Sequence, residues 1–289
     1  MEKLNVIAIS NQLKIDVDET CVRLYYNNLR EHLGASQIGR KCKRYLFYHF
    51  RWCFNSVKDA RKLRLFNRGH REEERFLEWL REIGCVITDK EADTGKQIRI
   101  TDCFEHFGGS LDGEGYLPES YEISEKVLFE FKTNGTGKGF DGVKVNGMKY
   151  AKEEHYVQTC VYGYKRNLRY VVYCIINKND DSLIIQLVEL DHEVGKAAIE
   201  KANQIIFSEY PPDRISNIPT FFSCKYCEAL QICHFNGEIN KNCRSCKNSK
   251  PVENAKWFCK VFNSIIPEDF ILTGCENWLS VNPNVNNDD

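Results

Sequence analysis

The sequence lacks an excess of either charge sign and lacks any long apolar run. Its 289 residues include 40 Lys and Arg against 41 Asp and Glu, a formal net charge of −1, so any nucleic-acid surface must be local. No stretch approaches the roughly 18 apolar residues of a membrane span, and we expect no membrane partner. The chain begins Met1-Glu2-Lys3-Leu4-Asn5, without a basic segment followed by an apolar one, so we expect no secretory signal and a cytoplasmic protein.

Cysteine, in contrast, is abundant, with fourteen in the chain. Thiols stay reduced in a cytosolic protein, so this density favours metal binding over disulfides. Seven of the cysteines lie between residues 224 and 275, a crowding that ordinary core cysteines would not show. We interpret six scattered ones as small core residues: Cys21, Cys53, Cys85, Cys103, Cys160 and Cys174.

The order of sequence patterns predicts an α/β fold, a central mixed sheet flanked by helices. Hydrophobic residues make up 42% of the chain and aromatic residues 12%, enough for one substantial core plus an appendage. The chain reads as helical to about residue 84, apart from the first ten residues. Strands are expected near 85–89, 96–101, 109–117, 125–132, 170–176 and 183–190, and helices near 148–165 and 193–207.

A charged pair interrupts an apolar strand pattern at Glu130-Phe131-Lys132. The two-residue period indicates a strand with one packed face, and it places Glu130 and Lys132 on the same side. A hairpin would bring Asp112, in the preceding turn, toward Glu130. Two carboxylates and an ammonium suit a hard divalent cation with water or phosphate beside it. The alternative is a solvated strand face and an ordinary Asp-Gly turn.

Residues 59 to 83 read as a helix that ends at Gly84. Its predicted inward stripe, Phe66, His70, Glu73, Leu77 and Leu80, contains two polar side chains. Buried polar groups need partners, which a metal site or a plain buried His–Glu pair would supply. A later helix carries His155, Gln158 and Tyr162 on one face, which is either part of a site or a polar surface.

Between Arg40 and Arg71 the sequence holds eleven basic residues against one acid, Asp59. Aromatic residues interleave with them: Tyr45, Phe47, Tyr48, Phe50, Trp52, Phe54 and Phe66. Basic groups neutralise phosphates and aromatic faces stack on unpaired bases, so the segment predicts a single-strand channel or else a solvated basic helix face. The DNA-binding candidates are Arg40, Arg44, Arg61, Lys62, Arg64 and Arg68.

The order Asp112, Glu130-Phe131-Lys132, Gln158, Tyr162 resembles the D…E-x-K…Q-x-x-x-Y motifs of PD-(D/E)XK nucleases, in their RecB-like branch. Upstream, the segment 68–73 resembles the first motif of that branch. The resemblance covers roughly residues 68 to 162. It implies a restriction-endonuclease-like core and a DNA exonuclease of phage-type recombination, repair or replication, in the host cytoplasm if phage-encoded. A non-catalytic iron–sulfur or zinc nucleic-acid-binding module is the alternative.

The same resemblance implies a Mg²⁺ or Mn²⁺ site. Asp112 and Glu130 would hold the ion with the backbone carbonyl of Phe131, and His70 with Glu73 would complete the shell.

The remaining motif residues would act on the substrate. Lys132 would orient or help deprotonate the attacking water and offset charge on the scissile phosphate. Gln158 and Tyr162 would steer the backbone of the substrate strand.

Cys224, Cys227 and Cys233 form C-x2-C-x5-C, and Cys42 is the natural fourth thiolate. One distant cysteine plus this spacing resembles the iron–sulfur exonucleases of the RecB-like branch, which implies a [4Fe-4S] cluster. Four thiolates also suit zinc, and the spacing leaves that alternative open.

The second set, Cys243, Cys246, Cys259 and Cys275, predicts a small zinc site, with His234 as a possible substitute ligand. The sequence has few apolar residues here, so a structural metal is what this segment needs. We therefore predict a nuclease domain over 1–235 and a zinc-binding module over 236–289, with the last dozen residues disordered.

Overall fold

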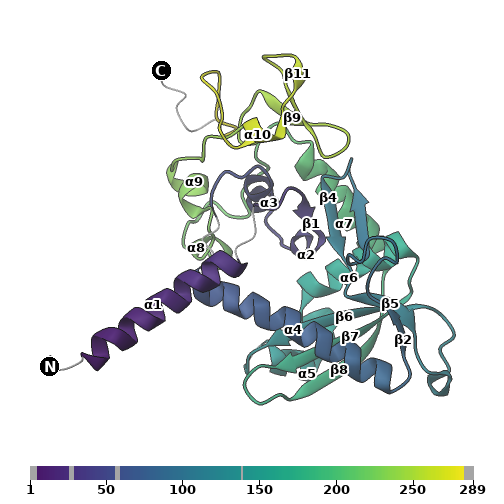
Figure 1. Ribbon diagram of the computed structural model, residues 1–289. Helices are drawn as coiled ribbons and strands as arrows, with labels where there is room; N and C mark the ends of the chain where they lie inside the picture. The colour runs from purple at the N-terminus through teal and green to yellow at the C-terminus, as the bar shows by residue number, and fades with distance from the viewer. Residues whose placement is uncertain (1–4, 26–28, 56–58, 138, 283–289) are drawn as a thin grey trace.

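The protein is described from a computed structural model that covers residues 5–25, 29–55, 59–137 and 139–282. Lys58 of the basic segment and residues 283–289 of the predicted disordered tail lie outside this range. The central sheet occupies one end of the molecule and the cysteine-rich C-terminal segment the other (Figure 1). Among the described helices, none combines the length and apolarity that crossing a membrane requires.

Five strands form the central sheet, in the order β2-β5-β6-β7-β8. They are β2 Val86–Thr88, β5 Gly113–Tyr116, β6 Val127–Asn134, β7 Tyr170–Asn177 and β8 Leu183–Glu189. Only β6 and β7 pair in parallel, so the sheet is mixed, and the crossover between them carries two helices. This pairing sets Glu130 directly opposite Tyr173.

Helices cover both faces of this sheet (Figure 1). On one face, α4 (Ala60–Glu82) stacks the ring of Phe76 on Phe131 at 5.1 Å between centroids. On the other face lie α5 (Phe140–Ala151) and α6 (Glu153–Arg166). The architecture confirms the predicted α/β fold, a central mixed sheet flanked by helices.

A further helix, α7 (His192–Ile206), packs closely on α6. A Cβ at Gly195 would lie 2.2 Å from the carbonyl oxygen of Cys160, so only glycine permits this approach. The predicted helix near 193–207 is thus confirmed.

Two small sheets and several short helices complete the chain. The first sheet joins β1 (Leu33–Gly34), β4 (Phe107–Ser110) and β3 (Arg99–Asp102). The second joins β9 (Ser249–Pro251), β10 (Trp257–Cys259) and β11 (Ser264–Ile265). The remaining helical elements are α1 Val6–Tyr25, α2 Ala35–Ile38, α3 Lys43–Phe50, η1 Glu119–Tyr121, α8 Phe222–Lys225, α9 Leu230–Phe235 and α10 Glu268–Ile271.

Three predicted elements differ from the structure. The strand expected over 109–117 is two strands in different sheets, because the buried Leu111 bonds back to Ile98 (2.9 Å) before the chain turns at Asp112. The helix expected over 148–165 breaks at Lys152, whose φ of −136° is not helical. The first ten residues are not all irregular, since α1 begins at Val6.

The predicted inward stripe of α4 is wrong in part. Phe66 is 54% exposed, whereas Glu72 is buried and bonds Arg75 at 2.7 Å. Leu77 and Leu80 are buried as predicted, because only the C-terminal half of α4 lies on the sheet. The N-terminal half contacts α1, where Arg64 pairs with Asp18. Gly84 follows the helix at a positive φ of 96°, as the stop signal predicts.

The strand β6 also differs from the prediction of one packed face. Its residues from Val127 to Phe131 are all buried, because α4 covers one side and α6 the other. Glu130 and Lys132 do point to the same side, toward α6.

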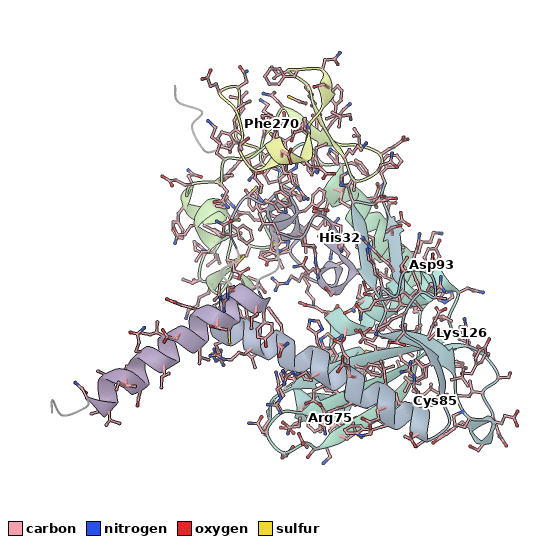
Figure 2. All side chains as sticks on the ribbon, in the orientation of Figure 1. His32, Arg75, Cys85, Asp93, Lys126 and Phe270 are labelled. Carbon is pink, nitrogen blue, oxygen red and sulfur yellow. The ribbon has the colours of Figure 1, made fainter. Side chains whose placement is uncertain are left out.

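The C-terminal segment is built onto the N-terminal helices. Trp257 is buried and packs on Phe50 of α3, with 5.5 Å between ring centroids. The predicted disorder is wrong for the described end of the tail, since Val281 and Asn282 are buried. Figure 2 shows Phe270 on this segment, far from Arg75 and Cys85 at the sheet. The division into domains at residue 235 stays a prediction.

All fourteen cysteines are free of disulfides. The core role is confirmed for Cys53, Cys85, Cys160 and Cys174, which are buried, while Cys103 is half-buried. It is wrong for Cys21, which lies on α1, a helix with no buried residue.

Candidate active site

Asp112 is held against the strand that carries Glu130. Asp112 lies in the turn between β4 and β5, and its Oδ2 accepts the backbone N–H of Phe131 on β6 at 2.7 Å. The side chain is only partly buried. The structure therefore brings Asp112 beside Glu130, as the hairpin argument predicts.

Glu130 has no solvent exposure. Its Oε1 accepts from the Lys132 ammonium and from Gln158 Nε2, the latter at 2.9 Å. Its Oε2 is buried and finds no hydrogen-bond donor within the described residues. A buried carboxylate oxygen without a partner is costly, which marks a position where a cation or a bound water fits.

Lys132 also approaches the backbone of its own strand. Its Nζ lies 3.2 Å from the carbonyl oxygen of Phe131 and also donates to Glu130 Oε1. Burial lowers the pKa of Lys132, but the carboxylates of Glu130 and Asp112 outweigh it and hold that pKa above its ordinary value. The side chain therefore stays a cation, available to balance an anionic group.

Three carboxylates share this site, and the pKa of each is raised. Burial is the main cause, and it raises the pKa of Glu130 to about 7. Asp112 raises the pKa of both Glu130 and Glu73, because like charges lie close together. Burial likewise raises the pKa of Asp112, and this effect outweighs the lowering by Lys132 and by the hydrogen bond from the Phe131 N–H. A site with more carboxylate charge than ammonium charge attracts a divalent cation.

Helix α6 supplies the polar side chains above this strand. Gln158 is buried and donates from Nε2 to the hydroxyl of Tyr162 at 3.3 Å as well as to Glu130. His155, one turn earlier, bonds the hydroxyl of Tyr173 through Nδ1 at 2.8 Å. Burial lowers the pKa of His155 to about 3, with Lys132 adding to the effect, so this imidazole is neutral.

Helix α4 supplies His70 and Glu73, which approach each other at 3.4 Å between Nδ1 and Oε1. Glu73 is partly buried and faces the carboxylates, whereas His70 is 71% exposed and lies at the rim. The structure thus brings Glu73 into the site and leaves His70 at its edge.

The described residues do not form a ready-made metal cluster. No group of three or more His, Cys, Asp or Glu side chains among them, the two cysteine sets included, is already arranged to hold an ion. The unpartnered Glu130 oxygen and the partly open Asp112 nevertheless fit a hard cation.

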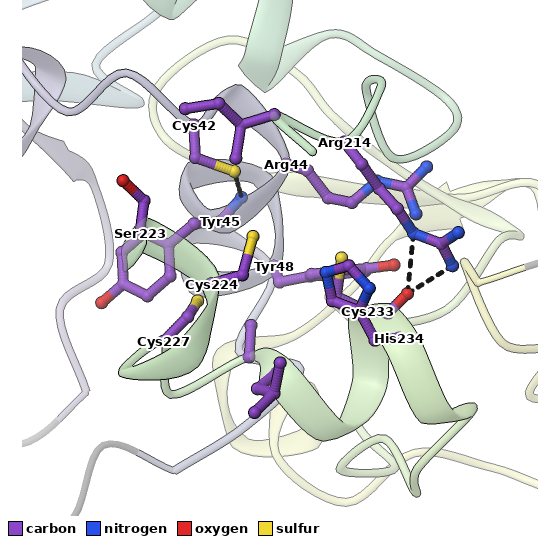
Figure 3. A pocket seen from close by; sticks show the side chains of 13 residues that line it. Cys42, Arg44, Tyr45, Tyr48, Arg214, Ser223, Cys224, Cys227, Cys233 and His234 are labelled. Carbon is purple, nitrogen blue, oxygen red and sulfur yellow. Dashed lines mark hydrogen bonds between the residues drawn. The ribbon is translucent and has the colours of Figure 1, made fainter. Parts of the chain in front are cut away.

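The first cysteine set lines one cavity together with Tyr45 and Arg214. Figure 3 shows Cys42 from the N-terminal region facing Cys224, Cys227 and Cys233 from the segment around α8 and α9. The backbone N–H of Tyr45 donates to Cys42 Sγ at 3.4 Å, and Arg214 Nε bonds the carbonyl of Cys233 at 2.9 Å. The structure gathers the four residues that the spacing singled out.

The DNA-binding candidates make different contacts within the protein. Arg40 lies over the Tyr45 ring at 4.3 Å, and Arg44 lines the cysteine cavity and bonds the carbonyl of Pro212. Arg64 is paired with Asp18, and Arg68 donates to the carbonyl of Lys178 at 3.0 Å.

Arg61 and Lys62 are exposed near the start of α4. Their surface position, which Arg40, Arg64 and Arg68 share, suits phosphate contact.

The aromatic residues of the basic segment do not form a stacking surface. Tyr45, Phe47, Tyr48, Phe50 and Trp52 are all buried, because α3 forms part of the core. Phe54 is half-buried, and Phe66 on α4 is exposed.

Sequence reasoning missed two sets of side chains. Tyr173 lies opposite Glu130 and orients His155, but a tyrosine in an apolar strand gives no signal of that position. Arg51 and Arg244 are both buried, and a single arginine gives no signal of burial in the sequence.

No protein-family model and no curated protein sequence matches the chain. Among solved structures, the alkaline exonuclease LHK-Exo from Laribacter hongkongensis is similar at a TM-score of 0.43 and 14% identity, over 65% of this chain and 90% of that one. LHK-Exo in complex with dAMP gives 0.40 and 14%, over 61% and 86%. The protein SSO0001 gives 0.41 and 16%, over 78% and 96%. The functional inference depends on the geometry of the site itself.

Proposed function

We propose that this chain is a divalent-metal-dependent nuclease, and more narrowly a DNA exonuclease. The observation that carries the proposal is Glu130, a fully buried carboxylate with one unpartnered oxygen beside Asp112 and the Lys132 ammonium. The motif resemblance supports the narrower choices of DNA, of exonuclease activity and of a phage-type role in recombination, repair or replication.

The residues fit a Mg²⁺ or Mn²⁺ ion. Asp112 and Glu130 would hold it, with the carbonyl of Phe131 and the carboxylate of Glu73 within the same site. When bound, such an ion polarises a phosphoryl oxygen and lowers the pKa of bound water.

Side chains of the site supply the remaining catalytic roles. Lys132 keeps its proton beside Glu130 and Asp112, so it offers positive charge to the phosphate and a donor that orients water. Gln158 fixes the Glu130 carboxylate from α6. Tyr162, a buried residue whose hydroxyl accepts from Gln158, would act with it in steering the substrate backbone. A backbone bond to Phe131 fixes Asp112, so the site is preorganised on rigid elements.

The decisive experiment is cleavage of end-labelled single- and double-stranded DNA with Mg²⁺ or Mn²⁺, comparing wild type with Asp112→Asn. Asparagine can still accept the Phe131 N–H, so the fold is kept and only the charge is lost. We expect cleavage to be abolished, while the control Asp102→Asn, which breaks a surface pair with Lys165, stays active. Full divalent-dependent activity in Asp112→Asn would overturn the proposal.

We further propose that the first cysteine set holds a [4Fe-4S] cluster. The four thiols line one cavity from two distant parts of the chain, and the Tyr45 N–H already points at a sulfur. Protein purified without oxygen should be brown, with broad absorption near roughly 400 nm. Cys42→Ser should lose the colour as completely as Cys227→Ser, and the control Cys103→Ser should keep it. Zinc alone in metal analysis would replace the iron–sulfur assignment and leave the nuclease proposal standing.

A further inference from the structure

The second cysteine set lines a separate cavity at the C-terminal end. Cys243 and Cys246 come from a tight turn, Cys259 from the end of β10, and Cys275 from the chain after α10. We call these four residues the C-terminal quartet. Apolar side chains such as Ile266 and Trp278 share the cavity wall. The backbone N–H of Asn248 points at Cys246 Sγ at 3.4 Å, a contact that favours a sulfur carrying negative charge.

Two arginines are buried beside this quartet. Arg51, at the end of α3, is 2% exposed, and Arg244, between Cys243 and Cys246, is 1% exposed. Arg51 Nη1 lies 3.0 Å from the carbonyl oxygen of Arg244 and 3.4 Å from that of Cys246. Arg51 therefore lies against the backbone that carries the thiols, and the Arg244 guanidinium lies on the neighbouring residues Phe50 and Trp52.

Both guanidiniums are enclosed by aromatic rings and carbonyl groups. Arg244 lies 4.0 Å from the centroid of Trp52 and 4.9 Å from that of Trp257, and it bonds the carbonyl of Phe50. Arg51 lies 5.3 Å from the same Trp257 ring. These contacts offset part of the desolvation but carry no full negative charge, and the Nε of each arginine is left without an acceptor in the described residues.

No carboxylate balances the pair within the described part of the chain. The acids that influence them, Glu209 and Glu31, are both exposed, and Glu209 is paired with Lys260 at 2.8 Å. Cys53 lies close to both arginines, but burial raises its pKa to about 12, so it stays neutral. Two buried cations without a counter-charge would be strongly destabilising.

We propose that the C-terminal quartet binds one zinc ion as four thiolates, and that this anionic centre is the counter-charge of Arg51 and Arg244. A divalent ion with four thiolates carries two net negative charges, which equals the charge of the two guanidiniums. Four neutral thiols would leave the arginines uncompensated. Tetrahedral zinc with sulfur ligands is the usual structural site for such short, paired spacing. The site needs no nuclease activity.

The arrangement also gives the zinc a structural task. Arg51 belongs to the N-terminal helical region and Arg244 to the C-terminal segment, so the charge balance links the two parts. Zinc binding then stabilises the docking of residues 243–275 onto α3, and removing zinc weakens it.

The first test is the metal content of the full-length protein by mass spectrometry. We expect Cys246→Ser to lose about one zinc per chain, while Cys21→Ser, a cysteine in neither set, retains the wild-type content. Metal bound at the first cysteine set is common to all three proteins and does not enter the difference. An unchanged zinc content in Cys246→Ser would overturn the site.

The second test addresses the counter-charge. Arg244→Met keeps an unbranched, largely apolar side chain and removes the cation, and Lys250→Met does the same at an exposed position of β9. Titration with a chromophoric zinc chelator should show zinc affinity reduced by at least about tenfold in Arg244→Met and unchanged in Lys250→Met. Should Arg244→Met not fold, Arg51→Met provides the same comparison. Wild-type zinc affinity in the folded arginine variant would refute the charge balance.

Discussion

The substitution Glu130→Gln tests whether the Glu130 carboxylate on β6 binds a metal ion or has only a structural role. Glutamine has nearly the same shape, and its amide oxygen can still accept from Lys132 and Gln158, as Glu130 Oε1 does. The substitution removes the negative charge and replaces the unpartnered Oε2 with an amide nitrogen. A hard cation has little affinity for that nitrogen, so the variant should fold and fail to bind the ion.

The expected magnitudes follow from linkage and from the chemistry. A divalent ion at ten times its Kd stabilises the folded state by about 1.4 kcal/mol. For a chain of this size that raises Tm by about 2–4 °C. Glu130→Gln should show none of this shift. Its cleavage rate should fall at least ~1000-fold, equivalent to about 4 kcal/mol of transition-state stabilisation.

Two measurements check this prediction: thermal unfolding with and without Mn²⁺, and cleavage of end-labelled DNA under the same conditions. The matched control is Glu114→Gln, another buried acid, located two residues after Asp112 and bonded to Arg166. That control should lose stability but keep both the Mn²⁺ shift and cleavage. The reasoning is refuted if Glu130→Gln keeps the Mn²⁺ shift, or if it cleaves DNA within tenfold of the wild-type rate.

Lys132→Met should keep the Mn²⁺-induced Tm shift, because an ammonium group does not coordinate a metal ion. The variant should cleave DNA at least ~100-fold more slowly than wild type, and wild-type turnover would exclude a catalytic role for this cation. Hydrogen bonds from Arg166 lower the pKa of Glu114 in the folded protein. The ionised Glu114 therefore stabilises the fold fully above the ordinary carboxyl pKa, and this stabilisation is lost as the pH falls through the lowered pKa of the folded state. Urea unfolding should therefore show Glu114→Gln destabilised by about 1–3 kcal/mol at pH 7 and much less in acid, and an equal deficit at both pH values would contradict the ion pair. Charge reversal of Arg61 and Lys62 should weaken DNA binding and flatten its salt dependence by about one unit of slope per lost phosphate contact. An unchanged slope would assign both residues to a solvated helix face.

Much of the architecture could be predicted because it follows from local rules. Two-residue alternation located β6, other strand patterns located β7 and β8, and α4 ended before Gly84, whose positive φ a glycine permits. The pairing of Asp112 with the Glu130 strand followed from chain reversal at a turn. Cysteine spacing, with Cys42 as the distant fourth member of the first set, indicated two sets of four, and each set lines one cavity.

The sequence could not show which faces would be covered, because burial depends on elements that arrive from elsewhere in the chain. Phe66 fits the stripe of α4 but extends beyond the edge of the sheet, while Glu72 is buried with Arg75. The aromatic residues of α3 look like a stacking surface until β1, β10 and the C-terminal segment enclose them.

Tertiary structure also decided the electrostatics. Glu130 looks like one acid on a half-exposed strand, and only the packing of α6 over β6 removes its solvent and raises its pKa. Arg51 and Arg244 are almost 200 residues apart, and nothing in either local pattern indicates that they share one buried space. Backbone geometry and side-chain periodicity act over a few residues, so they can be predicted from the sequence. Desolvation and charge compensation arise only when segments distant in the sequence pack together.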